Sequence, residues 1–70
     1  MSDLDAQLLA AHEAGDGPRL AKLYAQAAAA SESELQCSFY LTHAYVFALE
    51  AGLPEAKDYH QQLKLMGKEE

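Results

Sequence analysis

The amino-acid sequence predicts an all-α protein, and two observations support that prediction. The composition favours helices, because 14 of the 70 residues are Ala and 11 are Leu, whereas only Thr42 and Val46 are β-branched. Gly and Pro then divide the chain at 15–18 and at 52–54, between long stretches that lack a helix breaker. We expect four helices arranged as two stacked antiparallel helical hairpins, with a compact four-helix bundle as the alternative.

The first hairpin is expected over about residues 3–30. Its first helix has apolar residues at helical spacing, namely Leu4, Leu8 and Ala11. Gly15 is suited to end this helix, because glycine adopts the left-handed conformation without steric cost. Pro18 fits the first turn of the next helix, where a missing N–H costs nothing.

The second hairpin is expected over about residues 33–67. Either Ser31 or Ser33 is placed to cap a helix that begins near Glu34 and ends at Gly52. Pro54 opens the last helix. The apolar residues of that helix are Ala56, Tyr59, Leu63 and Met66. Their spacing predicts that Tyr59 and Leu63 pack on the preceding helix. Residues 1–70 are therefore interpreted as a single domain.

The helix predicted over 34–51 is the most apolar segment, and its apolar residues surround most of its circumference. A helix that is apolar on all sides is normally buried on all sides. We therefore expect it to be the central element, or to lie against another protein. Its aromatic set of Tyr40, His43 and Phe47 fits either core packing or an exposed surface for a partner.

The two halves of the chain resemble each other at an offset of 35 to 37 residues. The matched positions are Glu13–Gly15 with Glu50–Gly52, Pro18 with Pro54, and Tyr24 with Tyr59. A period of this length with two helices per unit resembles the tetratricopeptide repeat. Tyr40, Ala44 and Phe47 match the first helix of that repeat, and Gly52, Ala56 and Tyr59 match its turn and second helix.

That resemblance implies stacked hairpins whose first helices bind a peptide or protein. The surface it implies carries Asp5, Leu9, His12, Leu41, Tyr45 and Leu49. This set contains no Lys or Arg, so an apolar or mildly basic ligand suits it better than a carboxylate does.

The charge and the apolar content argue against several classes of partner. The formal net charge is −6, and the five basic residues are scattered, whereas a nucleic-acid binder needs clustered Lys and Arg. No apolar run approaches the ~20 residues that span a bilayer, and the first residues do not resemble a secretory signal. With Cys37 as the only cysteine, a reducing compartment is favoured. We expect a cytoplasmic protein that binds neither nucleic acid nor membrane.

The sequence contains no pattern that is typical of a catalytic, cofactor-binding or metal-binding site. Cys37 and His43 are six residues apart, about 120° around one helix, so they do not share an ion without further ligands. The other histidines, His12 and His60, lie on other predicted helices. The serines are better explained as helix caps or helix surface than as nucleophiles. We expect no catalytic residue, no cofactor and no metal site.

The leading interpretation is a small non-catalytic protein–protein interaction module, an adaptor or regulator. The alternative is a structural subunit of a homo-oligomer or of a larger complex, and an enzyme of unknown reaction is the third. A domain of this size buries only about 60% of its unfolded surface, and much of the apolar content here is Ala. We therefore expect a homodimer or obligate association with another protein.

Overall fold

Residues 3–67 fold into four α-helices, as the sequence predicts. The computed structural model describes residues 3–67 and places α1 at Asp3–Ala14, α2 at Gly17–Ala30, α3 at Glu34–Ala51 and α4 at Glu55–Leu65. This part of the chain contains no strand. The predicted all-α class is confirmed.

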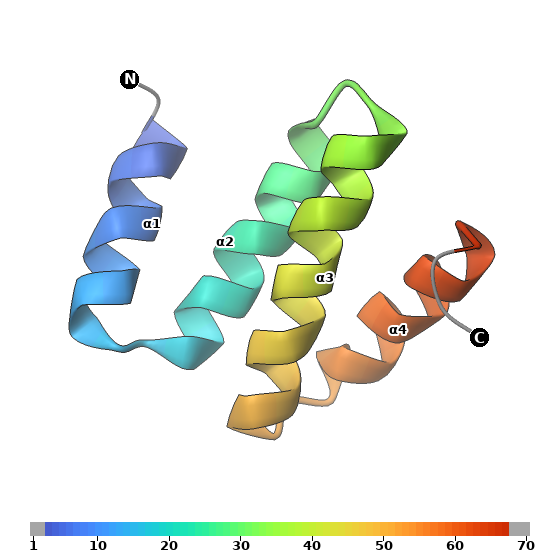
Figure 1. The fold of residues 1–70 in the computed structure, drawn as a ribbon. Coiled ribbons are helices and arrows are strands. Elements are labelled where there is room, and N and C mark those ends of the chain that lie inside the picture. The colour runs from blue at the N-terminus through green and yellow to red at the C-terminus, as the bar shows by residue number, and fades with distance from the viewer. Residues whose placement is uncertain (1–2, 68–70) are drawn as a thin grey trace.

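Each helix packs on the helix that precedes it in the sequence. Consecutive helices run in opposite directions, and the most extensive contact is between α2 and α3 (Figure 1). Within the described residues, α1 and α4 lie at opposite edges and do not pack on each other. The arrangement is therefore a sequential array of antiparallel helices, and the contact between first and last helix that closes a four-helix bundle is missing.

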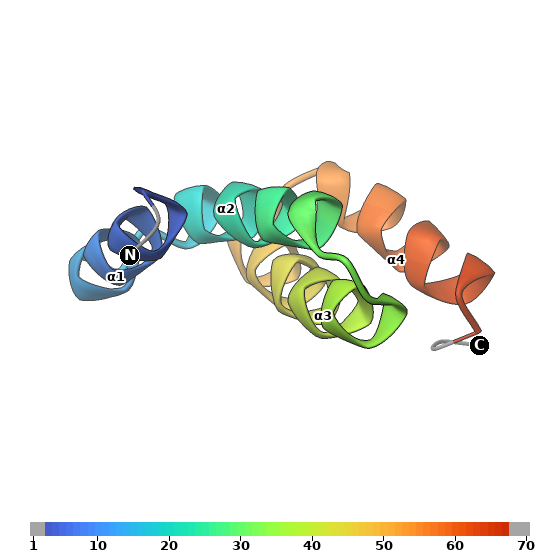
Figure 2. The same ribbon diagram turned by 90° about the horizontal axis from the view of Figure 1, so that it is seen from above.

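The array is flat. Its Cα atoms extend over 32 × 28 × 12 Å. Seen from above, α2 lies toward one broad face and α3 toward the other (Figure 2). Only α2 and α4 pack closely on α3. The expectation that α3 is buried on all sides is therefore wrong within this chain, because two neighbours cover only part of its circumference.

The helix ends are set by local chemistry. Gly15 and Gly52 adopt positive φ values of 65° and 69° after α1 and α3, as expected of glycines that end helices. The side chain of Asp16 accepts a hydrogen bond from the backbone N–H of Arg19 at the start of α2. Of the two serines considered as caps for α3, Ser33 accepts from Gln36 N–H at 3.1 Å.

The core is built largely from alanine and leucine. One cluster joins Ala11 to Leu20 and Leu23, a second joins Ala21 to Ala48 and Ala56, and a third joins Ala28 to Leu41 and Leu63. The predicted packing of Leu63 on α3 is confirmed, since Leu63 is fully buried against Leu41. Alanine contacts let α2, α3 and α4 approach closely.

Candidate interaction surface

The outward side of α3 carries a continuous row of large apolar side chains that no other element covers. Leu35 is 76% exposed, Phe39 57%, Val46 45% and Leu49 54%. Thr42 lies between them and is also exposed. These five residues, here called the α3 stripe, are separated by four, three, four and three residues. That alternation averages 3.5 residues and keeps all five side chains on one side of the helix.

The opposite side of α3 is made of Leu41, Ala44 and Ala48, which are buried. The fourth buried residue of this helix, Ser38, lies at the edge of the stripe, and its hydroxyl donates to the carbonyl oxygen of Leu35 at 2.9 Å. An ordinary amphipathic helix places its large apolar residues toward the core and its polar residues outward. In α3, four large apolar residues point outward although Leu41 is buried, so the stripe is unlike the solvent-facing side of an ordinary surface helix.

Polar groups within the stripe are satisfied by the helix itself. Thr42 Oγ1 donates to the carbonyl oxygen of Ser38 at 2.7 Å. Beside the stripe, His43 Nδ1 donates to the carbonyl oxygen of Phe39 at 2.9 Å. A hydroxyl with an internal acceptor loses little when a partner covers it, because its proton keeps a hydrogen bond. The stripe is therefore suited to burial along its whole length.

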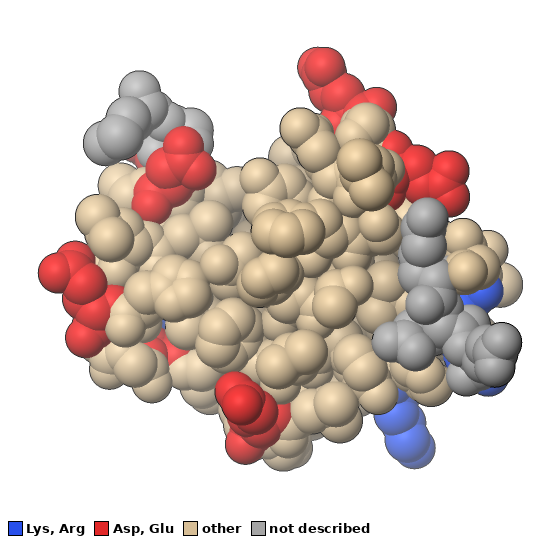
Figure 3. All heavy atoms as spheres, viewed as in Figure 1, with Lys and Arg blue, Asp and Glu red and all other residues tan. Residues whose placement is uncertain are grey.

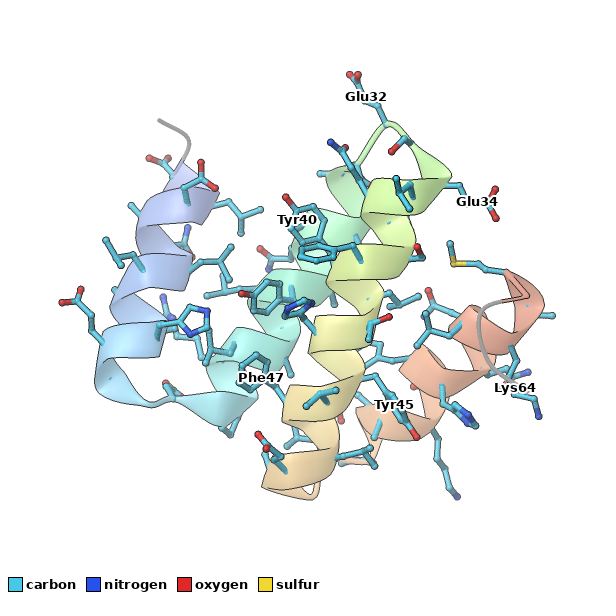
Figure 4. The ribbon with its side chains drawn as sticks, in the orientation of Figure 1. Glu32, Glu34, Tyr40, Tyr45, Phe47 and Lys64 are labelled. Carbon is cyan, nitrogen blue, oxygen red and sulfur yellow. The ribbon has the colours of Figure 1, made fainter. Side chains whose placement is uncertain are left out.

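Aromatic rings fill the flank of α3 that faces α1 and α2. Tyr24 is their centre, since its ring stacks on Phe47 at 5.7 Å and lies 5.0 Å from His43 and 6.3 Å from Tyr40, between centroids. His12 of α1 joins this cluster through a 2.9 Å hydrogen bond between its Nε2 and the Tyr24 hydroxyl. Tyr40 and Phe47 both point to this side (Figure 4). The His12 ring also meets that of Phe47 edge to face, with centroids 5.9 Å apart, so half-buried aromatic packing attaches α1 to both α2 and α3.

The other flank of α3 faces α4. Tyr45 lies on this side (Figure 4), and its ring stacks on His60 with centroids 5.1 Å apart and an interplanar angle of 14°. Burial raises the pKa of the Tyr59 hydroxyl, with smaller contributions from Glu55 and Asp58.

The outer side of α4 has a shallow depression that is lined by Lys57, His60, Gln61, Lys64 and Leu65. The two lysines give this part of the surface a positive charge.

The six residues implied by the repeat resemblance do not form one surface. Leu41 is only 2% exposed in the core, and Tyr45 faces α4. The α1 residues are exposed, but His12 is engaged with Tyr24. Leu49 is the one member of the set that belongs to the α3 stripe. Leu35, Phe39 and Val46 were not among the predicted residues, although their spacing of four and seven is visible in the sequence.

The surface around the stripe is largely free of charge. Viewed onto the face that α3 occupies, acidic groups lie at the edges of the molecule and the centre carries neither acids nor bases (Figure 3). The residues that flank the stripe on α3 are Gln36, Ser38, His43, Tyr45 and Glu50. A shallow depression at the N-terminal half of the stripe is lined by Leu35, Ser38, Phe39, Thr42 and His43. The local chemistry therefore suits an apolar ligand.

Ionisable side chains do not converge in the described part of the chain. Residues 3–67 contain no group of three or more His, Cys, Asp or Glu positioned to hold a metal ion. Cys37, the single cysteine, is half-buried on α3 near the cluster of Leu41 and Leu63. No helix in that range is both long and apolar enough to cross a bilayer.

Comparison with protein-family models, with curated protein sequences and with solved structures finds no match for this chain.

Proposed function

We propose that this protein is a small non-catalytic protein–protein interaction module and that the α3 stripe is its binding surface. The observation that supports this most directly is the exposure of Leu35, Phe39, Val46 and Leu49 on one side of a single helix. Scattered apolar residues are normal on a protein surface, but a contiguous row usually marks a contact site.

The spacing of the stripe indicates what it binds. Apolar residues that alternate at four and three positions match the side of a helix that packs along another helix. The expected partner therefore presents an apolar helical surface. Nucleic acid and membrane surfaces are unsuitable ligands, because the chain carries a formal net charge of −6.

A regulator or adaptor acts by association alone, so no catalytic residue, cofactor or metal enters the proposed activity. The single cysteine, half-buried Cys37, suits a reducing compartment, and we place the protein in the cytoplasm.

A pair of variants tests the proposed function in the native cell. Val46→Glu puts a charge in the middle of the stripe, whereas Gln26→Glu adds the same charge at an exposed position of α2. In α2, Gln26 is separated from Tyr24 by about 200° around the helix, so it lies away from α3. Proximity labelling should lose its specific neighbours with Val46→Glu and keep them with Gln26→Glu. Identical neighbour sets for both variants would refute the proposed function.

A further inference from the structure

We propose that the partner of the α3 stripe is a second copy of this chain, in a dimer whose two α3 helices pack stripe against stripe. The inference rests on the proposed function and names its partner. Four observations support a second copy: the symmetry of the stripe, its lack of charge, its length and the thinness of the helical array.

The stripe is nearly symmetric about its middle. Leu35 and Leu49 each lie seven residues from Thr42, while Phe39 lies three residues before it and Val46 four residues after it. A two-fold axis near Thr42 would therefore bring apolar residues against apolar residues along the whole contact. A surface shared by two identical chains must be self-complementary in this way. Thr42, at the centre, already has its hydroxyl bonded to Ser38.

The charge distribution also favours self-association at this surface. Two copies of a chain with a formal charge of −6 repel each other wherever their acidic groups meet. The centre of the face that α3 occupies is free of charge, and the acidic groups lie at its edges (Figure 3). The dimer therefore buries no charged group at its centre and leaves the acidic groups near solvent.

The length of α3 sets the length of the contact. An 18-residue helix is about 27 Å long, and the stripe runs from its second residue to its sixteenth. Two α3 helices that cross at a small angle can therefore meet along all five residues of the stripe.

The dimer also supplies a missing layer. Most domains consist of at least two packed layers of secondary structure around one core. This array is only 12 Å thick between its outermost Cα atoms, and α3 has no neighbour on its outward side (Figure 2). A second copy, face to face, turns two thin arrays into one layered particle with the stripes in its centre.

Sedimentation of the full chain tests the proposal. At about 100 µM the wild-type protein should sediment as a 15.2 kDa species, twice the chain mass of 7.6 kDa, and its melting temperature should rise with protein concentration. Val46→Glu should weaken association at least about tenfold, because the new carboxylate is then buried against apolar side chains of the other copy. Gln26→Glu should leave it unchanged. A wild-type monomer at this concentration, or a Val46→Glu dimer of undiminished affinity, would overturn the proposal.

Cross-linking gives a second test that does not depend on how well Val46→Glu folds. In a Cys37→Ser background, Thr42→Cys places one thiol at the centre of the stripe and Gln26→Cys places one on the far side of α2. A short bis-maleimide should cross-link the Thr42→Cys chains into dimers and leave the Gln26→Cys chains monomeric. Cross-linking of Gln26→Cys alone, or of neither variant, would contradict the proposed interface.

The outcomes separate this inference from the proposed function. If the purified protein is a monomer but its neighbours in the cell are lost with Val46→Glu, the second copy is excluded and the stripe remains a binding surface for another protein. If Val46→Glu changes neither the mass in solution nor the neighbours in the cell, both proposals fail.

Discussion

The two sides of α3 differ in a way that reverses the usual design of a surface helix. The inward side carries Ala44 and Ala48, which are completely buried, whereas the outward side carries Leu35 and Phe39, which are more than half exposed. Small residues inside allow α2 and α4 to approach closely, while large residues outside are left without a partner. Apolar content and burial are therefore separate properties of a helix. Close packing within the chain buries Leu41, Ala44 and Ala48, and the large side chains of the α3 stripe remain available for association.

The largest expected effect comes from truncating Leu63, the one large side chain of residues 3–67 that is fully buried. Leu63→Ala should lower the free energy of unfolding by about 2–5 kcal/mol, because it removes buried methyl groups and leaves a cavity beside Leu41. The matched control is Leu65→Ala on the same helix, where the side chain is 81% exposed and the change should stay within about 0.5 kcal/mol.

Both free energies are measured by denaturant unfolding in the Val46→Glu background, so that association does not contribute. If Leu63→Ala and Leu65→Ala cost the same, the distinction between the inward and outward sides of this array is wrong.

Enlarging the inward side should be the next largest effect. Ala48 lies between Ala21 of α2 and Ala56 of α4, so Ala48→Leu forces three helices apart and should cost about 1–3 kcal/mol. The same change at exposed Ala29 should cost less than about 0.5 kcal/mol. Thermal unfolding of the two variants compares them directly. If Ala48→Leu and Ala29→Leu have equal melting temperatures, close approach of the helices is not the reason for alanine at position 48.

A smaller effect is expected on the flank that joins α3 to α1. Tyr24→Phe keeps the ring stacked on Phe47 but removes the hydrogen bond to His12, which is exposed, so the cost should be about 0.5 kcal/mol. The ring of Tyr40 packs in the same cluster. Tyr40→Phe removes only its hydroxyl and should cost less free energy of unfolding than Tyr24→Phe. A double-mutant cycle of Tyr24→Phe with His12→Ala isolates the pair. A coupling energy of zero would mean that the rings alone attach α1.

The smallest effect is a pH dependence on the α4 flank. Burial, Glu55 and Asp58 together raise the pKa of the Tyr59 hydroxyl above its ordinary value of 10.0. A raised folded-state pKa gives stability that is complete below the unfolded pKa and is lost as the pH rises through the folded one. Stability should therefore fall at alkaline pH, and Tyr59→Phe should make that fall less steep.

The pKa of Tyr59 is measured by following tyrosinate absorbance in the ultraviolet as the pH rises. The titration curve of Tyr59→Phe is subtracted from that of the wild type. A Tyr59 that titrates at or below the ordinary value would place its hydroxyl in solvent rather than against α3.

The helix boundaries were determined by the sequence alone, because the signals that set them are local. Glycine after α1 and α3, proline in the first turn of α2 and serine before α3 each act within one turn of the helix end. The predicted bounds of α3 are the observed ones, 34–51. The burial of Leu63 was predictable as well, since one side of α4 is regularly apolar.

Only the tertiary structure decided which side of α3 faces outward. When a helix is apolar on all sides, the sequence does not show which side faces the core. Leu41 and Leu49 therefore look alike in sequence, although Leu41 is buried and Leu49 is exposed. Size accounts for part of the choice, because Ala44 and Ala48 admit the backbones of neighbouring helices, whereas the bulkier Phe39 and Val46 do not. It does not separate Leu41 from Leu49, whose positions follow from the packing of α2 and α4. That competition between neighbours involves segments far apart in the chain, and no local pattern records its outcome.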